Sequence, residues 1–364
     1  MFKFLIVVRP LGLLYGSAGA FLSPENLVGR SGSKFPPDSS TLSGLFLSTN
    51  FQNPFIDQEE LKINLTIAGA FWARDEDIKD GDFYVPIPRS LIIDENRVDE
   101  WEIRSGKWCR SKPDEGINAT YSWQKISSWG NRTEIIRKKG VSKVPWEFMP
   151  ILHPTLDLEQ RRVRQPKNEN DRGSLFLENA VQMKEGSCLV YLATHQIPDG
   201  WYRFGGENHV VEITTQLINQ DVLDLLTQPI ERKFALICPA VWGTNNVSHR
   251  YPKAISFSNK RPEMLTDRPI PFRPRTVKAH DQQQRTNSLA IGRYAVPAGT
   301  VYVLKHPLEE KYNTWWKFPL DWFPQGNQKL STEQRPLPLK HLGCGLCLPI
   351  DIQESSSQDE GIAL

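Results

Sequence analysis

Proline is the residue that most constrains the fold of this chain. The sequence contains 27 prolines and 24 glycines among its 364 residues. Proline removes a backbone donor and interrupts helices, whereas glycine is typical of turns. The sequence therefore favours a β-rich fold with many loops. At this length we expect two domains that share an interface, and a hydrophobic fraction of 39% is enough for their cores.

One segment, residues 199–213, combines aromatic residues, a glycine pair and a polar cluster. It reads DGWYRFGGENHVVEI, so Trp201, Tyr202 and Phe204 surround Arg203 before Gly205 and Gly206. Glycine pairs allow positive φ angles or a close approach to another chain or ligand. We interpret the segment as a turn that leads into an alternating strand. Its polar residues form a recognition surface, or else the segment is an ordinary β-turn before a core strand.

Positive charge is concentrated in one proline-rich stretch. Between residues 250 and 293 we count ten Lys or Arg against three Asp or Glu, a local charge of +7, although the whole chain carries only +2. Prolines between the basic residues favour an extended loop or arm over a helix. Such an arm suits a phosphate backbone, and it equally suits a solvated loop. The basic side chains that we single out here are Arg268, Arg273, Arg275, Lys278 and Arg293.

The first residues imitate a secretory signal, but they read better as a buried strand. The apolar run that ends at Val8 is interrupted by Arg9-Pro10, short of a usual signal, so we predict a strand over 2–8. Five scattered cysteines do not suggest a disulfide framework, and no segment approaches the ~20 apolar residues of a membrane span. We therefore expect a cytoplasmic protein with no membrane partner.

The order of the predicted elements indicates an α+β fold. We predict a helix over 39–50 after the possible caps Asp38 and Ser39, strands over 61–72 and 187–194, and a helix over 220–227. This order suggests two ferredoxin-like (RRM-like) units, whose sheets and loops often bind single-stranded RNA. The expected division is 1–228 with a Trp-rich inserted hairpin or lobe at about 94–150, a second β-rich unit at 229–350, and a disordered acidic tail at 351–364.

Several short motifs occur in an order that resembles a known family. They are Pro10-Leu11-Gly12, Gly29-Arg30, Lys34–Asp38, Thr41–Leu45, Tyr84–Pro88, His153-Pro154 through Arg161 to Gly173–Phe176, Arg203–Glu207, Ala298–Tyr302 and Gly343–Gly345. In this order they resemble the motifs of the CRISPR repeat-associated mysterious proteins (RAMPs), and within that superfamily the group-five branch. The resemblance extends from residue 10 to about residue 349.

The resemblance implies a non-catalytic subunit of a type III CRISPR effector complex. Such a subunit binds the 5′ tag of the crRNA and contacts a large polymerase-like subunit and a backbone RAMP subunit. Members typically project a β-hairpin thumb that displaces a nucleotide, and the Trp-rich stretch from Asp94 to Trp146 is the candidate region for it here. No cofactor is implied.

The resemblance and the charge pattern together give a set of candidate RNA contacts. Arginine and lysine side chains suit phosphates, aromatic rings suit bases, and glycines allow backbone amides to approach the tag. A carboxylate would be repelled by phosphate, so Glu207 is expected to orient Arg203 or His209 or to accept from ribose. The candidates are Arg30, Lys34, Arg89, Arg161, Arg162, Trp201, Arg203, Gly205, Gly206, Glu207, His209, Arg273, Arg275, Lys278, Arg293, Gly343 and Gly345.

Enzymatic alternatives have fewer residues in their favour. The pair Cys344 and Cys347 has C-x-x-C spacing, but no second pair follows at metal-ligand spacing. The serious rival is a crRNA-processing endoribonuclease, which needs a histidine aligned with the RNA 2′-hydroxyl. His209 and His249 are the candidates for that histidine. Beside the glycine pair, His209 is expected to hold or orient RNA instead.

Overall fold

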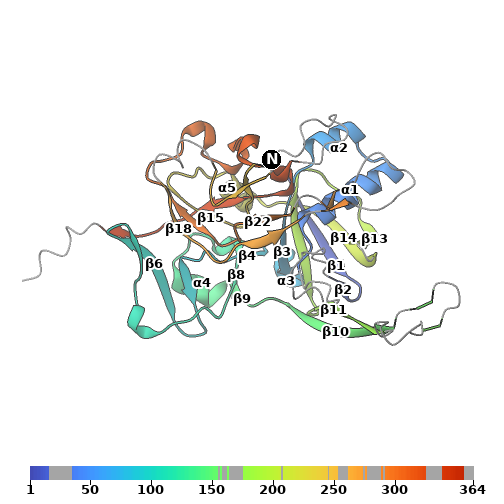
Figure 1. Cartoon of the computed structure of the whole chain (residues 1–364), viewed down its shortest axis with the longest axis horizontal. Helices are drawn as coiled ribbons and strands as arrows, with labels where there is room; N and C mark the ends of the chain where they lie inside the picture. Colours follow the sequence, from blue (N-terminus) through green and yellow to red (C-terminus); the bar gives the residue numbers. More distant parts are fainter. Residues whose placement is uncertain are drawn as a thin grey trace, which may run out of the picture.

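A computed structural model describes residues 1–15, 35–154, 156–157, 162–163, 175–205, 208–244, 246–252, 261–273, 275–276, 288–289, 292–324 and 338–355. Strands make up most of the regular structure and helices are few, so the α+β prediction is confirmed (Figure 1). No helix in these ranges is both long and apolar enough to cross a membrane. The candidates Arg30, Lys34, Arg161, Gly206, Glu207 and Lys278 lie outside the described residues.

The centre of the fold is an eight-stranded sheet in which the first strand lies third from one edge. Its order is β13 (Gly200–Phe204), β14 (His209–Leu217), β1 (Phe4–Pro10), β12 (Ser187–Ala193), β3 (Ile67–Arg74), β4 (Tyr84–Pro86), β8 (Trp123–Lys125) and β9 (Val141–Ser142). Every neighbouring pair is antiparallel. Because each strand alternates, β1 sends Ile6 and Val8 to one face of the sheet and Leu5 and Val7 to the other.

Each face of this sheet is covered by a different layer. On the first face, Ile6 and Val8 pack with Phe46 of α1 (Ser39–Gln52) and with Leu61 of α2 (Gln58–Asn64). On the second face, Leu5 belongs to the same core as Phe234 in the second β-rich unit. Side chains pointing to either face are therefore buried along the middle of the sheet.

The second β-rich unit shares its core with the first sheet. Its four-stranded sheet has the order β18 (Glu263–Leu265), β23 (Val301–Val303), β15 (Lys233–Leu236) and β24 (Cys347–Pro349). The remaining elements of this half are α5 (Gln220–Thr227), the strand pairs β16 (Trp242–Gly243) with β17 (Ser248–His249), β19 (Ile270–Phe272) with β22 (Arg293–Ala295) and β20 (Arg275–Thr276) with β21 (Ser288–Leu289), and the 3-10 helices η4 (Glu310–Tyr312), η5 (Trp315–Lys317), η6 (Leu320–Trp322) and η8 (Leu339–Leu342).

The stretch between β4 and β10 forms a lobe beside the main sheet. It contains β5 (Leu91–Ile93), β6 (Val98–Arg104), β7 (Lys107–Arg110), η2 (Pro113–Glu115), η3 (Ile126–Ser128) and α4 (Thr133–Lys139), and its β8 and β9 return to the large sheet. The chain end adds β25 (Glu354–Ser355), parallel to β6, where the Ile103 N–H donates to the Gln353 carbonyl at 2.9 Å. The prediction of disorder from residue 351 is therefore wrong as far as residue 355; residues 356–364 lie outside the described part.

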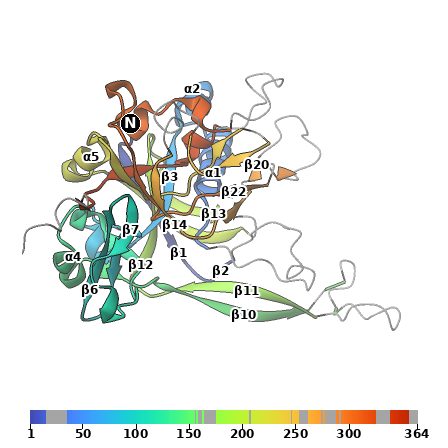
Figure 2. The same cartoon turned by 60° about the vertical axis from the view of Figure 1, so that its left-hand side comes forward.

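A long hairpin projects from the body. Its strands β10 (Trp146–Pro154) and β11 (Leu175–Met183) pair antiparallel along their whole length, and β2 (Leu14–Tyr15) joins β11 at the base (Figures 1 and 2). Trp146 fixes this base, because its ring meets Trp123 edge-on with centroids 6.1 Å apart and Phe35 with centroids 5.1 Å apart.

Most predicted elements are present, and two segments differ. The predicted helices over 39–50 and 220–227 are α1 and α5, and the predicted first strand is β1, shifted by two residues. Leu61–Asn64, predicted as strand, ends α2 instead, because the Asp57 carboxylate caps that helix by accepting from the Glu60 N–H. Gly200–Phe204, interpreted as part of a turn, is the outermost strand β13.

Candidate nucleic-acid interface

The outer end of the large sheet exposes a tryptophan and an arginine side by side. Trp201 and Arg203 are two residues apart on β13 and therefore point to the same face. Trp201 is 75% exposed, whereas Phe204, which points to the opposite face, is 1% exposed in the core. The hydroxyl of Tyr202 donates to the Pro198 carbonyl at 2.6 Å on that opposite side. Alternation along one strand thus anchors the strand and exposes the pair.

The neighbouring strands extend this surface. Across the strand pair Trp201 lies opposite Glu212 and Arg203 lies opposite Val210, which is 47% exposed. Glu212 in turn lies opposite Arg9 on β1. We call the surface made by Trp201, Arg203, Val210, Glu212 and Arg9 the β13–β14 face.

Arg9 is a member of this face that the sequence reasoning missed. Its Nε donates to Asp75 Oδ1 at 3.0 Å, and its Nη1 donates to Thr214 Oγ1 at 3.1 Å. The strand pattern contained the signal, since Leu5, Val7 and Arg9 occupy every second position and only the last is polar. The Arg9 guanidinium is thus already neutralised, and Arg203 is the more available cation of the two.

The turn after β13 requires residues that tolerate positive φ. Gly205 has φ +77° and Asn208 has φ +57°, a region that favours glycine and asparagine. A Cβ atom at Gly205 would meet nothing within 4 Å, so conformation and not space selects glycine there. His209 lies opposite Phe204 in the strand pair and therefore on the other face from Trp201. The structure does not bring His209 into the β13–β14 face.

The projecting hairpin exposes apolar side chains on both of its faces. Phe148 and Leu152 point to one side of β10 and Met149 to the other, and all three are exposed. Beyond the strands, Arg162 is exposed beside the bridge between Leu156 and Val163. Of the two alternatives for the stretch at about 94–150, an inserted hairpin or a lobe, the structure shows a lobe, and the hairpin that projects from the body begins at Trp146.

Gly343 and Gly345 approach protein, not a ligand. A Cβ at Gly343 would lie 2.5 Å from Ala68 Cα, and one at Gly345 would lie 2.6 Å from the Trp242 ring. Their N–H groups donate to the carbonyls of Lys340 and Pro239, both at 2.9 Å. The expectation that these amides face RNA is therefore wrong: both glycines are buried where the last turn packs on β3 and on β16.

The remaining candidate cations are divided among other roles. Arg89 pairs with Asp267 at 3.0 Å, and Arg293 Nη1 donates to the Thr244 carbonyl at 2.6 Å. Burial lowers the pKa of Arg293. Arg273 is half-buried after β19, and Arg275 belongs to β20. Of the basic stretch, β20 lies close to α1, which also contacts β13 (Figure 2).

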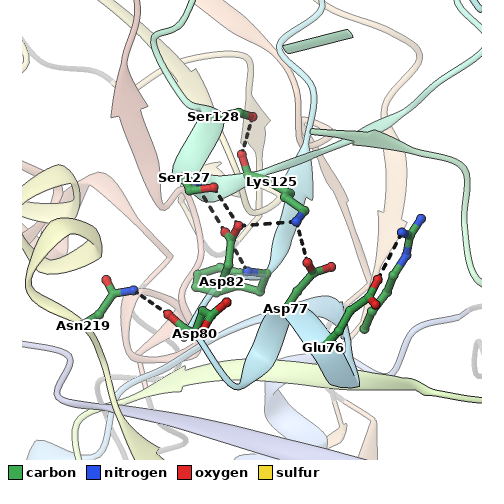
Figure 3. Close-up of polar contacts among 10 residues, drawn as sticks. Glu76, Asp77, Asp80, Asp82, Lys125, Ser127, Ser128 and Asn219 are labelled. Atoms are coloured by element: carbon green, nitrogen blue, oxygen red, sulfur yellow. Dashed lines mark hydrogen bonds and ion pairs between the residues drawn. The ribbon is translucent and has the colours of Figure 1, made fainter. Parts of the chain in front are cut away.

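An acidic cluster lies on the far side of Arg9. Residues 74–82 read RDEDIKDGD and include α3 (Asp75–Ile78). Figure 3 shows Lys125 between Asp77, with which it forms an ion pair, and Asp82 at 4.0 Å. Ser127 Oγ donates to Asp82 at 2.6 Å, and the Asn219 amide donates to the Asp80 carbonyl at 3.2 Å. Carboxylates in excess of cations repel phosphate, so this cluster bounds the β13–β14 face on one side.

Among the residues that the structure describes, no three His, Cys, Asp or Glu side chains are arranged to hold a metal ion. Cys344 and Cys347 are buried and unbridged. The Cys344 Sγ accepts from the Val241 N–H at 2.9 Å, and burial raises the pKa of this thiol to about 12. A buried neutral thiol with a backbone partner is a packing group.

Comparison with known proteins gives structural neighbours only. No protein family and no curated protein matches the sequence. A chain of the type III-B Cmr-beta complex bound to cognate target RNA and AMPPnP aligns at 13% identity over 82% of this chain and 86% of that chain, with a TM-score of 0.47. A chain of the Csm1-Csm4 cassette in complex with cA4 aligns at 12% identity over 97% and 100% of the two chains, with a TM-score of 0.43. A chain of the Csm3-Csm4 subcomplex in the type III-A CRISPR-Cas interference complex aligns at 10% identity over 85% and 96%, with a TM-score of 0.35.

Proposed function

We propose that this chain is a non-catalytic, RNA-binding subunit of a type III CRISPR effector complex. In this role it holds the 5′ tag of the crRNA and bridges the large polymerase-like subunit to the RAMP backbone. The observation that carries the proposal is the exposed Trp201 beside Arg203 on the outer strand of the sheet. Arg203 begins the segment Arg203–Glu207 that resembles the central Gly-Gly-Glu motif of the RAMP superfamily.

An exposed indole next to a guanidinium suits single-stranded RNA. A base stacked on an aromatic side chain contributes roughly 1–3 kcal/mol to binding whatever its sequence. Arg203 stands on the same face and can meet the adjoining phosphate, while Val210 offers apolar area for the sugar or base edge. The β13–β14 face therefore provides separate groups for the base and for the phosphate.

The charge distribution supports one path for the bound RNA. The acidic cluster of α3 lies next to Arg9 at the inner border of the β13–β14 face. Phosphates avoid such carboxylates, so the RNA runs along the β13 edge of the sheet, away from α3. The acidic side is left for protein partners, which is consistent with a bridging subunit.

The hairpin formed by β10 and β11 is the segment we propose as the thumb. A two-stranded ribbon exposes much of both faces, and here Leu152 is 58% exposed. Apolar side chains on a projecting ribbon can wedge between bases and unstack them. A projecting hairpin is what the resemblance to the group-five branch implies, with the third subunit of the type III-B complex as the first choice and the type III-D equivalent as the alternative. The interpretation as two ferredoxin-like units belongs to the same proposal.

The position of His209 argues against the endoribonuclease alternative. His209 lies on the opposite face of the sheet from Trp201 and Arg203, so it is not aligned with RNA held by that pair. His249 belongs to β17 and pairs with Trp242 in the second unit. Neither histidine is therefore placed to favour RNA cleavage over RNA binding.

One assay separates binding from processing. Purified protein is incubated with labelled repeat-containing RNA; binding is read by gel shift at several salt concentrations, and the recovered RNA is sized on a denaturing gel. We expect salt-sensitive binding with intact RNA, because phosphate contacts weaken steeply with salt. Site-specific cleavage that disappears in His209→Ala would overturn the non-catalytic role, and the absence of any RNA affinity would leave a protein-only scaffold.

A further inference from the structure

A groove lies at the opposite end of β1 from the β13–β14 face. It has a volume of about 580 Å³, and its lining includes Lys3, Glu60, Asn64, His195, Trp316 and His341. These residues come from the start of the chain, from α2, from the end of β12, from η5 and from η8. Ligand sites of small molecules have volumes of roughly 300–1,000 Å³ and combine apolar and aromatic side chains with a few polar groups.

The strand register separates this groove from the proposed RNA surface. The Lys3 N–H donates to the Ala193 carbonyl beside the groove, whereas Arg9, at the other end of β1, lies opposite Glu212. At about 3.4 Å per residue, the interval from Phe4 to Arg9 measures roughly 17 Å. The groove is thus a separate site, and the inference below does not depend on the proposed function.

His195 is held by Thr194 in a defined orientation. The Thr194 hydroxyl accepts from the Thr66 N–H at 2.9 Å and donates to the Asn64 carbonyl at 3.0 Å. It has no second proton, so its 2.8 Å contact with His195 Nδ1 is satisfied when that nitrogen carries the hydrogen. The His195 Nε2 then presents a lone pair, 4.0 Å from the Glu60 carboxylate at the rim of the groove.

His341 contributes the second imidazole. Its Nδ1 is buried and has no hydrogen-bond partner among the described residues. Burial lowers the pKa of both His195 and His341, so both rings are neutral at pH 7. The charged groups around them are Lys3, Glu60, Lys340 and the amine of Met1. Lys340 is itself occupied, because its Nζ donates to the Trp316 and Phe318 carbonyls at 2.8 and 2.5 Å.

Trp316 supplies the aromatic wall. Its indole is half-buried and is held edge-on by Phe2, with centroids 4.7 Å apart, and by Trp315, with centroids 4.9 Å apart. An indole fixed in this way loses little rotamer freedom when a planar ligand packs against it. The groove thus combines an aromatic surface, two imidazoles, the amines of Lys3 and Met1, and the Glu60 carboxylate at its rim.

We propose that this groove binds one nucleotide unit, with the base against Trp316 and the phosphate at Lys3, His195 and His341. The Glu60 carboxylate is suited to accept from ribose hydroxyls, and Asn64 is suited to the base edge. The same chemistry is offered by a free mononucleotide and by the terminal nucleotide of an RNA strand. An anion beside the imidazoles favours their protonated forms, so binding takes up protons and strengthens as the pH falls.

Calorimetric titration of the full chain tests this assignment. The ligands are AMP, adenosine, inorganic phosphate and a short RNA with or without a terminal phosphate, each at pH 7.5 and pH 6.0. The variants are Lys3→Glu and His195→Gln, which keeps a donor for Thr194. The control is Lys62→Glu, a charge reversal on α2 outside the groove, where Lys62 pairs with Glu59 at 2.7 Å. Circular dichroism confirms that each variant is folded.

We expect AMP to bind more tightly than adenosine or phosphate, and more tightly at pH 6.0 than at pH 7.5. Lys3→Glu should weaken AMP binding by roughly tenfold or more, because a carboxylate replaces the ammonium that faces the phosphate. Lys62→Glu should leave it unchanged. Tighter binding of the phosphorylated RNA than of AMP identifies a strand terminus as the ligand, and the reverse identifies a free nucleotide. No measurable AMP or RNA-terminus binding, or equal losses in Lys3→Glu and Lys62→Glu, would overturn the proposal.

Discussion

Trp201 lies directly opposite Glu212 across the outermost strand pair of the large sheet, on a face that is buried at the centre of the sheet. Val7, two strands away on β1, and Val190, three strands away on β12, occupy the same face with exposures of at most 1%. The same alternation that builds the core therefore exposes the indole only at the edge. This relationship gives the chain an aromatic platform without disturbing the fold.

Replacing this indole should weaken RNA binding without weakening the fold. For Trp201→Ala we expect a loss of roughly 1–3 kcal/mol in binding single-stranded RNA, because one stacked base loses its partner. Since Trp201 is 75% exposed, the unfolding midpoint should change little. Fluorescence anisotropy with a labelled tag RNA measures the first effect and urea unfolding the second. Leu217→Ala, at a 72% exposed position on β14, is the matched control and should leave RNA affinity intact.

The salt dependence of binding should reveal the contact made by Arg203. Removing one phosphate contact lowers the slope of log affinity against log salt by roughly 0.7 for a single strand. We therefore expect Arg203→Gln to have a shallower slope than the wild type, with a similar loss for every RNA sequence. Arg104→Gln, an exposed substitution in the lobe, should leave the slope as it is. Equal slopes for all three proteins would place the phosphate elsewhere.

Replacing the buried glycine Gly343 should destabilise the protein. Gly343 has φ +70°, and an added Cβ would lie 2.5 Å from the Ala68 backbone. Gly343→Ala combines left-handed strain with a steric clash, so we expect it to destabilise the protein by roughly 2–5 kcal/mol. Gly116→Ala has a similar φ of +61° but open space, and should cost about 1 kcal/mol. Urea unfolding of both variants separates clash from strain; similar losses would mean that the turn yields.

The sequence predicted local elements better than it predicted which residues meet. The predicted helices at 39 and 220 are both present. Asp38, predicted as a possible cap, is the N-cap residue of α1, and Asn219 caps α5 by accepting from the Val222 N–H at 2.9 Å. Gly200–Phe204 was misread because its two glycine neighbourhoods look like a turn, although its alternating Trp, Tyr, Arg and Phe fit an edge strand. The sequence identified Trp201 and Arg203 as candidate RNA contacts because aromatic and basic residues alternate there. That they share one face follows from their positions on β13.

The residues whose roles the sequence did not predict make contacts with residues that are distant along the chain. Gly343 resembles a ligand-binding glycine until Ala68 is seen against it, and Arg89 resembles a free cation until Asp267 is seen beside it. Arg9 was overlooked because its partners, Asp75 and Thr214, lie on other elements. Such pairings are fixed by the order of strands in the sheet, which local pattern does not encode.

Acid should destabilise the protein through the half-buried imidazole of His341. Burial holds the pKa of His341 below its usual value near 6.5, and Lys340 lowers it further. As the pH falls below about 6.5 the unfolded chain takes up this proton and the folded chain does not, so the free energy of unfolding decreases until the folded pKa is reached. Above pH 7 this histidine has no effect. Urea unfolding at pH 7.5 and 5.5 should show a smaller acid loss in His341→Gln than in the wild type.

The control for this pH effect is His306→Gln, at an exposed position of the second unit. It should follow the wild-type pH dependence. If His341→Gln and His306→Gln lose the same free energy between the two pH values, the acid effect does not originate at the buried imidazole.

Photo-crosslinking tests the central claim most directly. Purified protein is irradiated with tag-bearing crRNA, digested with trypsin, and the RNA-bearing peptides are located by mass spectrometry. We expect a crosslink at Trp201, in the peptide spanning residues 185–203, that is lost in Trp201→Ala and not in Leu217→Ala. Crosslinks confined to the lobe or to the acidic segment 74–82, with none in residues 185–217, would contradict it.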